Sequence, residues 1–351
     1  MGRIVVAGSG AMGAMIAYHL ALLGADDVVV AERGELAEGS TSRAMGGVRQ
    51  QFSTAAEVVL ARESIEFLAG LGPEFFRQVG YLFIATTPEG LESLEERRAL
   101  QQELGVPVER VDASRVAGLE VDDVLGATCC WRDGVAIPKS VALEVLRRAQ
   151  ELGVEVREHT PAEELDRDVL VIACGPWSPQ LAETVVGVEL PIRPLCRQLL
   201  RTTPIGGLPE DLPMVIEEET GFHFRRRDDR LVVAMTDPEP RWTYDATVDE
   251  SLFDDRLERL ARRYPPAAGA LIGDAWAGLY DMTPDAHPIV GEIADGVYAA
   301  CGFSGHGFMQ SPAVGRAVAE LIVRGESSLD LSPYALERFE SGAVFPEHLV
   351  L

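Results

Sequence analysis

Residues 3–13 read Arg3-Ile-Val-Val-Ala-Gly-Ser-Gly-Ala-Met-Gly13, which is the pattern of an apolar strand that runs into a glycine-rich turn. An amphipathic helix over residues 14–23 and a second strand, Val28–Ala31, are predicted to follow. In such a unit Gly8 permits the tight turn, Gly10 lets the backbone approach a pyrophosphate, and Gly13 lets helix and strand pack closely. The stretch therefore predicts the first half of a nucleotide-binding fold.

The residues around this turn indicate which cofactor it would take. The helix N-terminus offers free N–H groups and a partial positive charge to phosphates. Glu32 ends the second strand, at the distance from the glycines where an acid accepts ribose hydroxyls. An acid at this position disfavours a 2′-phosphate, so NADP is the least favoured occupant. An ADP-containing cofactor is predicted, and an ordinary βαβ unit with a flexible turn is the alternative.

Composition narrows the class of protein further. The chain has 351 residues and a formal net charge of −25, which disfavours nucleic acid and anionic membrane surfaces as partners. No secretory signal pattern and no uninterrupted apolar run of about 18 residues is present, so we expect a cytoplasmic protein without a membrane span. The five cysteines form no CxxC pair and the six histidines are scattered, so we expect no metal site.

The order of patterns along the chain predicts the architecture. The opening βαβ pattern gives way, between Pro191 and Asp237, to short alternating strands that are typical of an antiparallel sheet. Strand, glycine turn and helix return at Val297–Cys301, and a helix is expected over Pro312–Arg324. We therefore predict an α/β (α+β) fold in which a Rossmann-like βαβ domain is interrupted by an antiparallel-sheet substrate domain.

A second glycine turn, Gly302-Phe-Ser-Gly-His-Gly307, precedes the last of these helices. Three glycines beside a histidine exceed what a simple strand-to-helix turn needs, so we expect the backbone to approach a ligand here. If that ligand were a flavin, the helix N-terminus would face the N1–C2=O edge, where negative charge collects on reduction.

With these motifs in order, the sequence resembles the D-amino acid oxidase superfamily of FAD-dependent oxidoreductases. The branch it resembles most is that of the sarcosine oxidases and the FAD-bearing β subunit of L-proline dehydrogenases. The matching segments are Gly8–Gly13, Glu32, Gly39–Arg43, Gly47–Phe52, Gly80–Phe83, Gly278–Asp285 and Gly302–Gly307. The resemblance implies that the first turn binds the ADP part of FAD and the second the isoalloxazine.

The resemblance also implies roles for individual residues. Arg49 corresponds to a basic residue on the substrate side of the flavin, Tyr280 to a tyrosine of the substrate pocket, and His306 to a residue at the flavin edge. These three are the catalytic candidates. The implied cofactor-binding residues are Gly8, Gly10, Ala11, Met12, Gly13, Glu32, Arg33, Thr41, Ser42, Arg43, Gly46, Gly47, Val48, Cys174, Gly175, Trp177, Gly302, Gly305, His306, Gly307, Phe308 and Met309.

The implied domains are both discontinuous. Residues 1–80, 139–190 and 278–351 would form the FAD-binding domain, and residues 81–138 and 191–277 the substrate-binding domain. Besides a small amino acid substrate, an α-type partner subunit or a second copy of the chain are the partners that the resemblance allows.

The sequence departs from the family pattern at four positions. Gly278 stands where monomeric sarcosine oxidases attach FAD to a cysteine, and Pro138 near where heterotetrameric ones attach FMN to a histidine, so FAD is expected to be non-covalent. No lysine lies on the strand Leu231–Met235, where a lysine would activate oxygen, and Met309 replaces a substrate-binding lysine. Fast use of oxygen is therefore not expected.

Three functional hypotheses follow. The first is FAD-dependent oxidation of a small secondary or N-methyl amino acid, or of glycine or a D-amino acid, by hydride transfer from the α-carbon to flavin N5, which gives an imine. The second is a nicotinamide-dependent dehydrogenase, and the third a non-catalytic flavin-binding partner subunit. Arg49 is interpreted as a clamp for the substrate carboxylate, with a surface cation or a phosphate partner as the alternatives. The cluster Arg225–Arg230 is read as a solvated hairpin turn.

Overall fold

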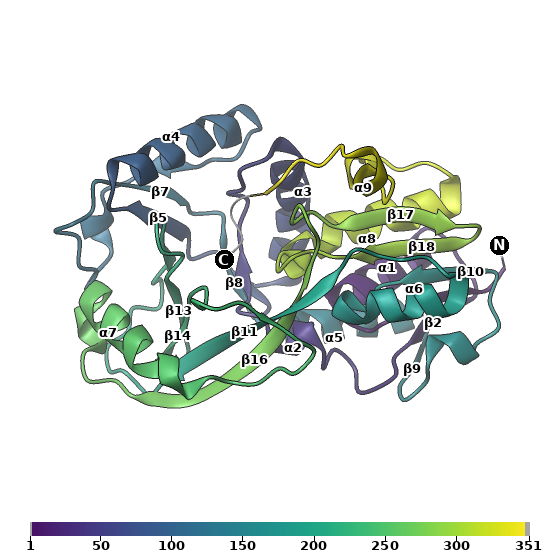
Figure 1. Cartoon of the computed structure of the whole chain (residues 1–351), viewed down its shortest axis with the longest axis horizontal. Coiled ribbons are helices and arrows are strands. Elements are labelled where there is room, and N and C mark those ends of the chain that lie inside the picture. The colour runs from purple at the N-terminus through teal and green to yellow at the C-terminus, as the bar shows by residue number, and fades with distance from the viewer. Residues whose placement is uncertain (1, 348–351) are drawn as a thin grey trace. The chain divides into compact units, whose positions relative to one another are not determined.

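The computed structural model describes residues 2–347, which form two compact units (Figure 1). Unit 1 comprises residues 2–44, 137–195 and 279–347, and unit 2 comprises residues 45–136 and 196–278. Within residues 2–347, no helix combines the length and the apolar character needed to cross a lipid bilayer.

Unit 1 is built on a six-stranded sheet in the order β17-β18-β10-β1-β2-β9. The five strands from β18 to β9 are parallel, and β17 pairs antiparallel with β18. Both faces of a parallel sheet are covered, so its inner strands β1, β2 and β10 are apolar throughout, as in the buried stretch Ile4–Ala7. The strands are β1 (Ile4–Ala7), β2 (Val28–Ala31), β9 (Glu155–Arg157), β10 (Val169–Ile172), β17 (Ile289–Ala294) and β18 (Val297–Cys301).

Helix α1 (Ala11–Leu22) packs along both α5 (Pro138–Glu151) and α8 (Gly307–Arg324). The approach of α1 to α8 is close, because a Cβ added to Gly315 would lie 2.6 Å from the Cβ of Met15. The chain segments that carry the two glycine turns are therefore held against each other by helix packing. Smaller helices of this unit are α2 (Ser40–Arg43), α6 (Ser178–Val186) and α9 (Arg338–Ser341).

The parallel strands of unit 1 place four turns at one edge of the sheet. The carboxyl ends of parallel strands meet at the same edge, which is where open α/β sheets bind their ligands. The turn Gly8–Gly10 follows β1, Glu32 follows β2, Cys174 follows β10, and the turn Gly302–Gly307 follows β18. Segments that are some 300 residues apart in the sequence thus belong to a single edge.

Unit 2 contains a nine-stranded mixed sheet in the order β15-β11-β14-β13-β12-β5-β7-β6, with β16 paired to β11. Most neighbours are antiparallel, as predicted for the region between Pro191 and Asp237, but β12 pairs parallel with β5. Two of the boundaries between the units fall inside β11 and β16. The strands are β5 (Tyr81–Ala85), β6 (Glu109–Arg110), β7 (Gly126–Cys130), β11 (Arg193–Thr202), β12 (Met214–Glu217), β13 (His223–Arg227), β14 (Arg230–Ala234), β15 (Arg241–Trp242) and β16 (Ile272–Met282).

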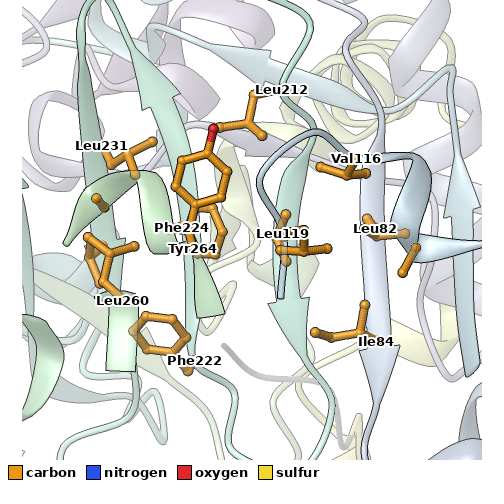
Figure 2. Close-up of a cluster of buried hydrophobic side chains, with 14 of the residues drawn as sticks. Leu82, Ile84, Val116, Leu119, Leu212, Phe222, Phe224, Leu231, Leu260 and Tyr264 are labelled. Carbon is orange, nitrogen blue, oxygen red and sulfur yellow. The ribbon is translucent and has the colours of Figure 1, made fainter. Parts of the chain in front are cut away.

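One face of this sheet forms the main hydrophobic core of unit 2 (Figure 2). Alternate residues of the strands, such as Leu82, Phe224 and Leu231, point into it, and Leu260 of α7 (Phe253–Arg263) and Tyr264 close it. Because side chains alternate along a strand, the residues between them lie on the opposite face of the sheet. That opposite face carries the polar groups described below.

A three-stranded sheet, β3-β8-β4, completes unit 2 together with two helices. Its strands are β3 (Gly47–Val48), β4 (Phe76–Arg77) and β8 (Gly134–Ala136), and the helices are α3 (Ala55–Leu71) and α4 (Pro88–Glu103). These contacts place residues 45–80 in unit 2, whereas the predicted FAD-binding domain included them. The pairing of β3 and β4 with β8, which is distant in sequence, is the reason for the difference.

The predicted helix over Pro312–Arg324 begins five residues earlier, at Gly307. Pro312 is therefore inside α8 and not in its first turn. A proline cannot donate to the carbonyl four residues before it. Here the hydroxyl of Ser311 donates to that carbonyl, the oxygen of Phe308, at 2.9 Å, so the helix continues through the proline.

Candidate functional site

The first glycine turn of unit 1 has no room for side chains at two positions. Gly8 has φ of +99°, and a Cβ there would lie 2.6 Å from the carbonyl oxygen of Ala173. A Cβ on Gly13 would lie only 1.9 Å from the carbonyl oxygen of Gly8. The two glycines therefore let the start of α1 sit directly on the turn that follows β1. Gly10 is less constrained, because its Cβ would meet only the Thr41 hydroxyl, at 3.0 Å.

Glu32 is held beside this turn. Its carboxylate accepts the backbone N–H of Ser9 at 3.0 Å, the Ser9 hydroxyl at 2.8 Å and the N–H of Gly34 at 2.9 Å. The Ser9 hydroxyl in turn accepts the N–H of Ala37 at 2.9 Å. An ionised carboxylate has about four lone-pair positions, so Glu32 retains capacity for a further donor.

The segment that follows Glu32 lies against the start of α1. The Thr41 hydroxyl accepts the N–H of Ala11, the first residue of α1, at 3.0 Å. On the other side, the guanidinium of Arg33 lies over the ring of Trp177, 4.9 Å from its centroid. The predicted residues Glu32, Arg33, Thr41 and Trp177 are thus grouped around the first turn and α1, while Arg43 is exposed to solvent.

Cys174, at the end of β10, is a neutral thiol and not a reactive one. Burial raises its pKa to about 12, and the nearby Glu32 carboxylate acts in the same direction. Its Sγ donates to the carbonyl oxygen of Ala7 at 3.3 Å. The thiol therefore ties β10 to β1 beneath the turn, and Gly175 follows with φ of +53°.

The second glycine turn also has positive φ angles and leaves little room for side chains. Gly302, Ser304 and Gly305 have φ of +76°, +52° and +94°. A Cβ on Gly305 would lie 2.4 Å from the ring of Tyr280, so the predicted pocket tyrosine packs directly on the turn. His306 caps α8, and Gly307, Phe308 and Met309 form its first turn.

Asp281 organises this turn, and the sequence analysis did not single it out. Its carboxylate accepts the N–H of Gly302 at 2.7 Å, and its carbonyl accepts the N–H of Ser304 at 3.2 Å. Burial raises the pKa of Asp281 to about 6, opposed by hydrogen bonds from the backbone of the turn. The only sequence signal was its place in the Gly278–Asp285 motif, next to Tyr280.

In unit 2, the predicted residues Gly46, Gly47 and Val48 lie at β3, where the carbonyl of Gly46 accepts the N–H of Ala136 at 2.7 Å. A Cβ on Gly47 would lie 2.7 Å from the hydroxyl of Tyr81. The backbone of β3 therefore lies directly against the large sheet, on the face opposite its hydrophobic core.

Arg49 follows β3 and is almost fully buried, with 1% of its surface exposed. Its Nη1 donates to the carbonyl oxygen of Gln51 at 2.7 Å, and the guanidinium lies 4.2 Å from the centroid of the Phe52 ring. The alternative reading of Arg49 as a surface cation is therefore wrong, because the side chain is inside unit 2.

A buried carboxylate fixes the segment that carries Arg49. Asp133 accepts the side-chain amide of Gln50 at 2.9 Å and that of Gln51 at 3.0 Å, and Gln51 also donates to the carbonyl of Tyr81 at 2.9 Å. Burial raises the pKa of Asp133 to about 6, opposed by these amide donors. Asp133 thus links β3 to the turn between β7 and β8.

His223 lies on the same face of the sheet and was also missed. Its pKa is lowered to about 4, chiefly by burial and also by the positive charges of Arg49 and Arg197, while the hydrogen bond to the Gly221 carbonyl raises it. Its Nδ1 lies 2.7 Å from the carbonyl oxygen of Gly221, which fixes the proton on Nδ1 of a neutral ring. Nε2 is then an acceptor near the positive charges of Arg49 and Arg197.

The structure therefore groups the predicted residues by unit. The two glycine turns, Glu32, Arg33, Thr41, Cys174, Trp177, Tyr280 and His306 lie in unit 1, whereas Gly46, Gly47, Val48 and Arg49 lie in unit 2. Asp281, Asp133 and His223 are the additions that the structure makes to these groups.

Comparison with known proteins identifies the family to which this fold belongs. Residues 3–321 match the family model described as DAO, FAD dependent oxidoreductase. The chain is 30% identical to FAD-dependent oxidoreductase domain-containing protein 1 of Bos taurus, over 99% of this chain and 87% of that protein. It is 27% identical to 4-methylaminobutanoate oxidase (formaldehyde-forming) of Paenarthrobacter nicotinovorans, over 96% of this chain but only 45% of that protein.

Among solved structures, L-proline dehydrogenase from P. horikoshii is similar throughout. Its TM-score is 0.89 at 30% sequence identity, and the match covers 97% of this chain and 98% of that chain. The expected fold class, a Rossmann-like domain interrupted by a largely antiparallel sheet, is thereby confirmed, and so is the resemblance on which the expected cofactor depended.

Proposed function

The chain belongs to the family of FAD-dependent oxidoreductases, and we propose that it oxidises a small amino acid with a secondary or N-methylated amine. The observation that carries this proposal is the geometry of the two glycine turns. Both follow strands of one parallel sheet, and both contain glycines at which a Cβ would collide with neighbouring atoms.

The residues at this edge of the sheet fit FAD. The N-terminus of α1 and the glycine turn before it suit a pyrophosphate, and the Glu32 carboxylate suits the ribose hydroxyls. The first turn of α8 would face the isoalloxazine, with Tyr280 packed on the same glycine turn. When bound, FAD supplies an acceptor for a hydride. The nicotinamide hypothesis loses its support, because the chain belongs to an FAD-dependent family.

We propose that FAD is held without a covalent bond. The resemblance implies that Gly278 stands where related enzymes attach a flavin through cysteine, and that Pro138 lies near where others attach one through histidine. The thiols of Cys129 and Cys174 are held neutral, because burial raises the pKa of each to about 12. Only a thiolate is a good nucleophile, so neither thiol favours attachment.

The substrate proposal rests on Arg49 and on the relatives. A buried guanidinium binds a carboxylate strongly through two parallel hydrogen bonds, which fixes the orientation of the substrate. The names of the similar proteins concern a proline and an N-methylated amine. In the proposed reaction the α-carbon loses a hydride, the amine nitrogen forms a C=N bond, and water then hydrolyses the imine. The role of the chain is to hold the carboxylate and orient the C–H bond.

The electron acceptor is proposed to be a molecule other than oxygen. The strand β14 (Arg230–Ala234) contains no lysine, and Met309 follows the second glycine turn. The lack of a lysine on β14, and a methionine at position 309 where relatives have a substrate-binding lysine, also favour the second candidate function. That function is a non-catalytic flavin-binding subunit of a larger assembly. Reduction of the flavin by an amino acid separates the two candidates, and the native mass of the purified protein shows whether a second chain is present.

The test of the cofactor proposal is direct. The purified protein should be yellow, and acid precipitation should release all of its flavin as FAD. Yellow colour that stays with the precipitate would refute non-covalent binding. With substrate present, an artificial dye should be reduced faster than oxygen, and hydrogen peroxide formed in step with imine would refute the proposed acceptor.

A further inference from the structure

Arg225 lies on the polar face of the large sheet in unit 2. Along β13 the side chains alternate, so that Phe222 and Phe224 enter the hydrophobic core (Figure 2), while His223 and Arg225 lie on the opposite face. Arg225 is buried, with 3% of its surface exposed. The reading of Arg225–Arg230 as a solvated turn is therefore wrong for Arg225, and holds for Asp228 and Asp229, which are exposed.

The contacts of Arg225 connect it to the strand that precedes Arg49. Its Nη2 donates to the carbonyl oxygen of Ala136 at 3.2 Å, and the N–H of Ala136 donates to the carbonyl of Gly46 at 2.7 Å. The guanidinium thus lies in the layer between the large sheet and the β3-β8 pair. It also lies near Tyr81 of β5, which pairs with Met214 of the neighbouring strand β12.

The guanidinium of Arg225 has no anionic partner within residues 2–347. No carboxylate oxygen of this part of the chain lies within 4.0 Å of it, and its buried Nε has no hydrogen-bond acceptor there. Three other buried arginines in the described chain are paired: Arg263 with Glu217 at 2.7 Å, Arg338 with Asp285 at 2.9 Å, and Arg256 with Asp237 at 3.4 Å. Arg225 differs from these three in having no carboxylate within reach in the part of the chain that the structure describes.

An unpaired buried charge is costly. Removing a guanidinium from water costs several kcal/mol, and a nearby anion is the usual compensation. Burial lowers the pKa of Arg225 to about 10, and the positive charge of Arg227 adds to the effect. The group nevertheless stays cationic at neutral pH. An anion that binds at this face would therefore gain a strong, poorly screened interaction.

We propose that Arg225 binds a second carboxylate of the substrate, so that the preferred substrates are dicarboxylic amino acids with a secondary amine. This inference rests on the proposed function, in which Arg49 binds the first carboxylate. Two buried guanidinium groups, on β13 and after β3, then select for two carboxylates on one molecule. A substrate with a single carboxylate leaves Arg225 unpaired and binds more weakly.

The test compares two substrates that differ by one carboxylate: N-methylglycine and iminodiacetate, in which a carboxymethyl group replaces the methyl. With a dye as acceptor, the wild type should show at least a tenfold higher kcat/KM for iminodiacetate. Arg225→Gln should lower kcat/KM for iminodiacetate by 10- to 100-fold, about the range for a charge-assisted hydrogen bond. It should change the value for N-methylglycine less than threefold.

Two further variants control this comparison. Arg227→Gln removes the same charge two residues along β13, from a side chain that is partly exposed, and should leave the ratio of the two substrates unchanged. Arg225→Lys keeps the charge but loses the two-pronged donor, and should give an intermediate ratio. An equal loss for both substrates in Arg225→Gln, or a wild type that prefers N-methylglycine, would overturn the proposal.

A binding measurement does not need turnover. Malonate should raise the Tm of the wild-type holoprotein more than acetate does at equal ionic strength, and an equal effect of the two anions would overturn the proposal. If no amine reduces the flavin while malonate still stabilises the wild type and not Arg225→Gln, the proposed function fails and the anion site at Arg225 stands.

Discussion

Replacement of Gly13 by alanine tests whether the first glycine turn is built as described. The added Cβ would lie 1.9 Å from the carbonyl oxygen of Gly8, 3.0 Å from its carbonyl carbon and 3.4 Å from a methyl of Val6. The first two contacts are with backbone, which cannot rotate away as a side chain would. Gly8 has φ of +99°, so the turn itself has little freedom to adjust. Helix α1 must therefore move away from the turn.

The expected loss of stability follows from two opposing terms. Overpacking of this kind costs on the order of 3 kcal/mol, the upper part of the usual range. Alanine in place of glycine inside a helix stabilises the folded state by about 1 kcal/mol. The net loss of about 2 kcal/mol corresponds to a fall in Tm of roughly 3–5 °C, depending on whether the chain or unit 1 alone unfolds. FAD should also be lost, because the N-terminus of α1 is displaced.

The assay is thermal unfolding of the apoprotein, together with the ratio of flavin to protein absorbance in the purified holoprotein. Gly70→Ala is the matched control, because Gly70 also lies in a helix, α3, and its Cβ would meet nothing within 4 Å. That control should gain about 1 kcal/mol and retain its FAD. A Gly13→Ala variant that matches the control in both Tm and flavin content would refute the close packing of α1 on the turn.

Three other changes test separate parts of the account. Gly10→Val should leave the apoprotein folded, because only the Thr41 hydroxyl must move, but should abolish FAD retention; stoichiometric FAD in this variant would show that the pyrophosphate lies elsewhere. Arg49→Lys should weaken transition-state binding by about 1–3 kcal/mol, measured as a fall in kcat/KM at normal flavin content, because a point charge replaces a two-pronged donor. Unchanged kcat/KM would remove Arg49 from the substrate site. Asp133 has a pKa raised to about 6 from 3.8, so the unfolded chain binds fewer protons between these values and the free energy of unfolding falls as pH rises from 4 to 6, by up to about 3 kcal/mol. Asp133→Asn should flatten this dependence in denaturant titrations between pH 4 and pH 7, and an unaltered slope would contradict the assignment.

Local patterns were sufficient to predict the strands and glycine turns of unit 1 that we propose bind the cofactor. The strands Val28–Ala31 and Val297–Cys301 have the predicted bounds, and the first glycine turn lies between β1 and α1 as expected. Each of these features is a short segment whose glycines and apolar residues act on their immediate neighbours. The order of the segments then determined the fold class, because parallel strands need crossover connections.

The features that were missed depend on contacts between distant segments. Arg225 lies in a run of charged residues, and its burial follows only from the pairing of β13 with β12 and β14. Asp281 organises the second turn because β16 brings it to Gly302, 21 residues later in the chain. The early start of α8 is a local exception, in which the hydroxyl of Ser311 donates to the carbonyl of Phe308, the one that Pro312 cannot donate to. No periodicity in the sequence reports such pairings.

Anaerobic titration of the purified holoprotein with amino acids tests the central proposal most directly. The flavin absorbance near 450 nm, a property of any oxidised flavin, should bleach on addition of a small secondary or N-methylated amino acid, and the bleached protein should recover its colour faster with a dye than with air. The panel should include proline, N-methylglycine, iminodiacetate, glycine and D-alanine. A holoprotein that carries stoichiometric FAD, and is reduced by dithionite but by none of these amines, would contradict the account and favour a non-catalytic flavin-binding subunit.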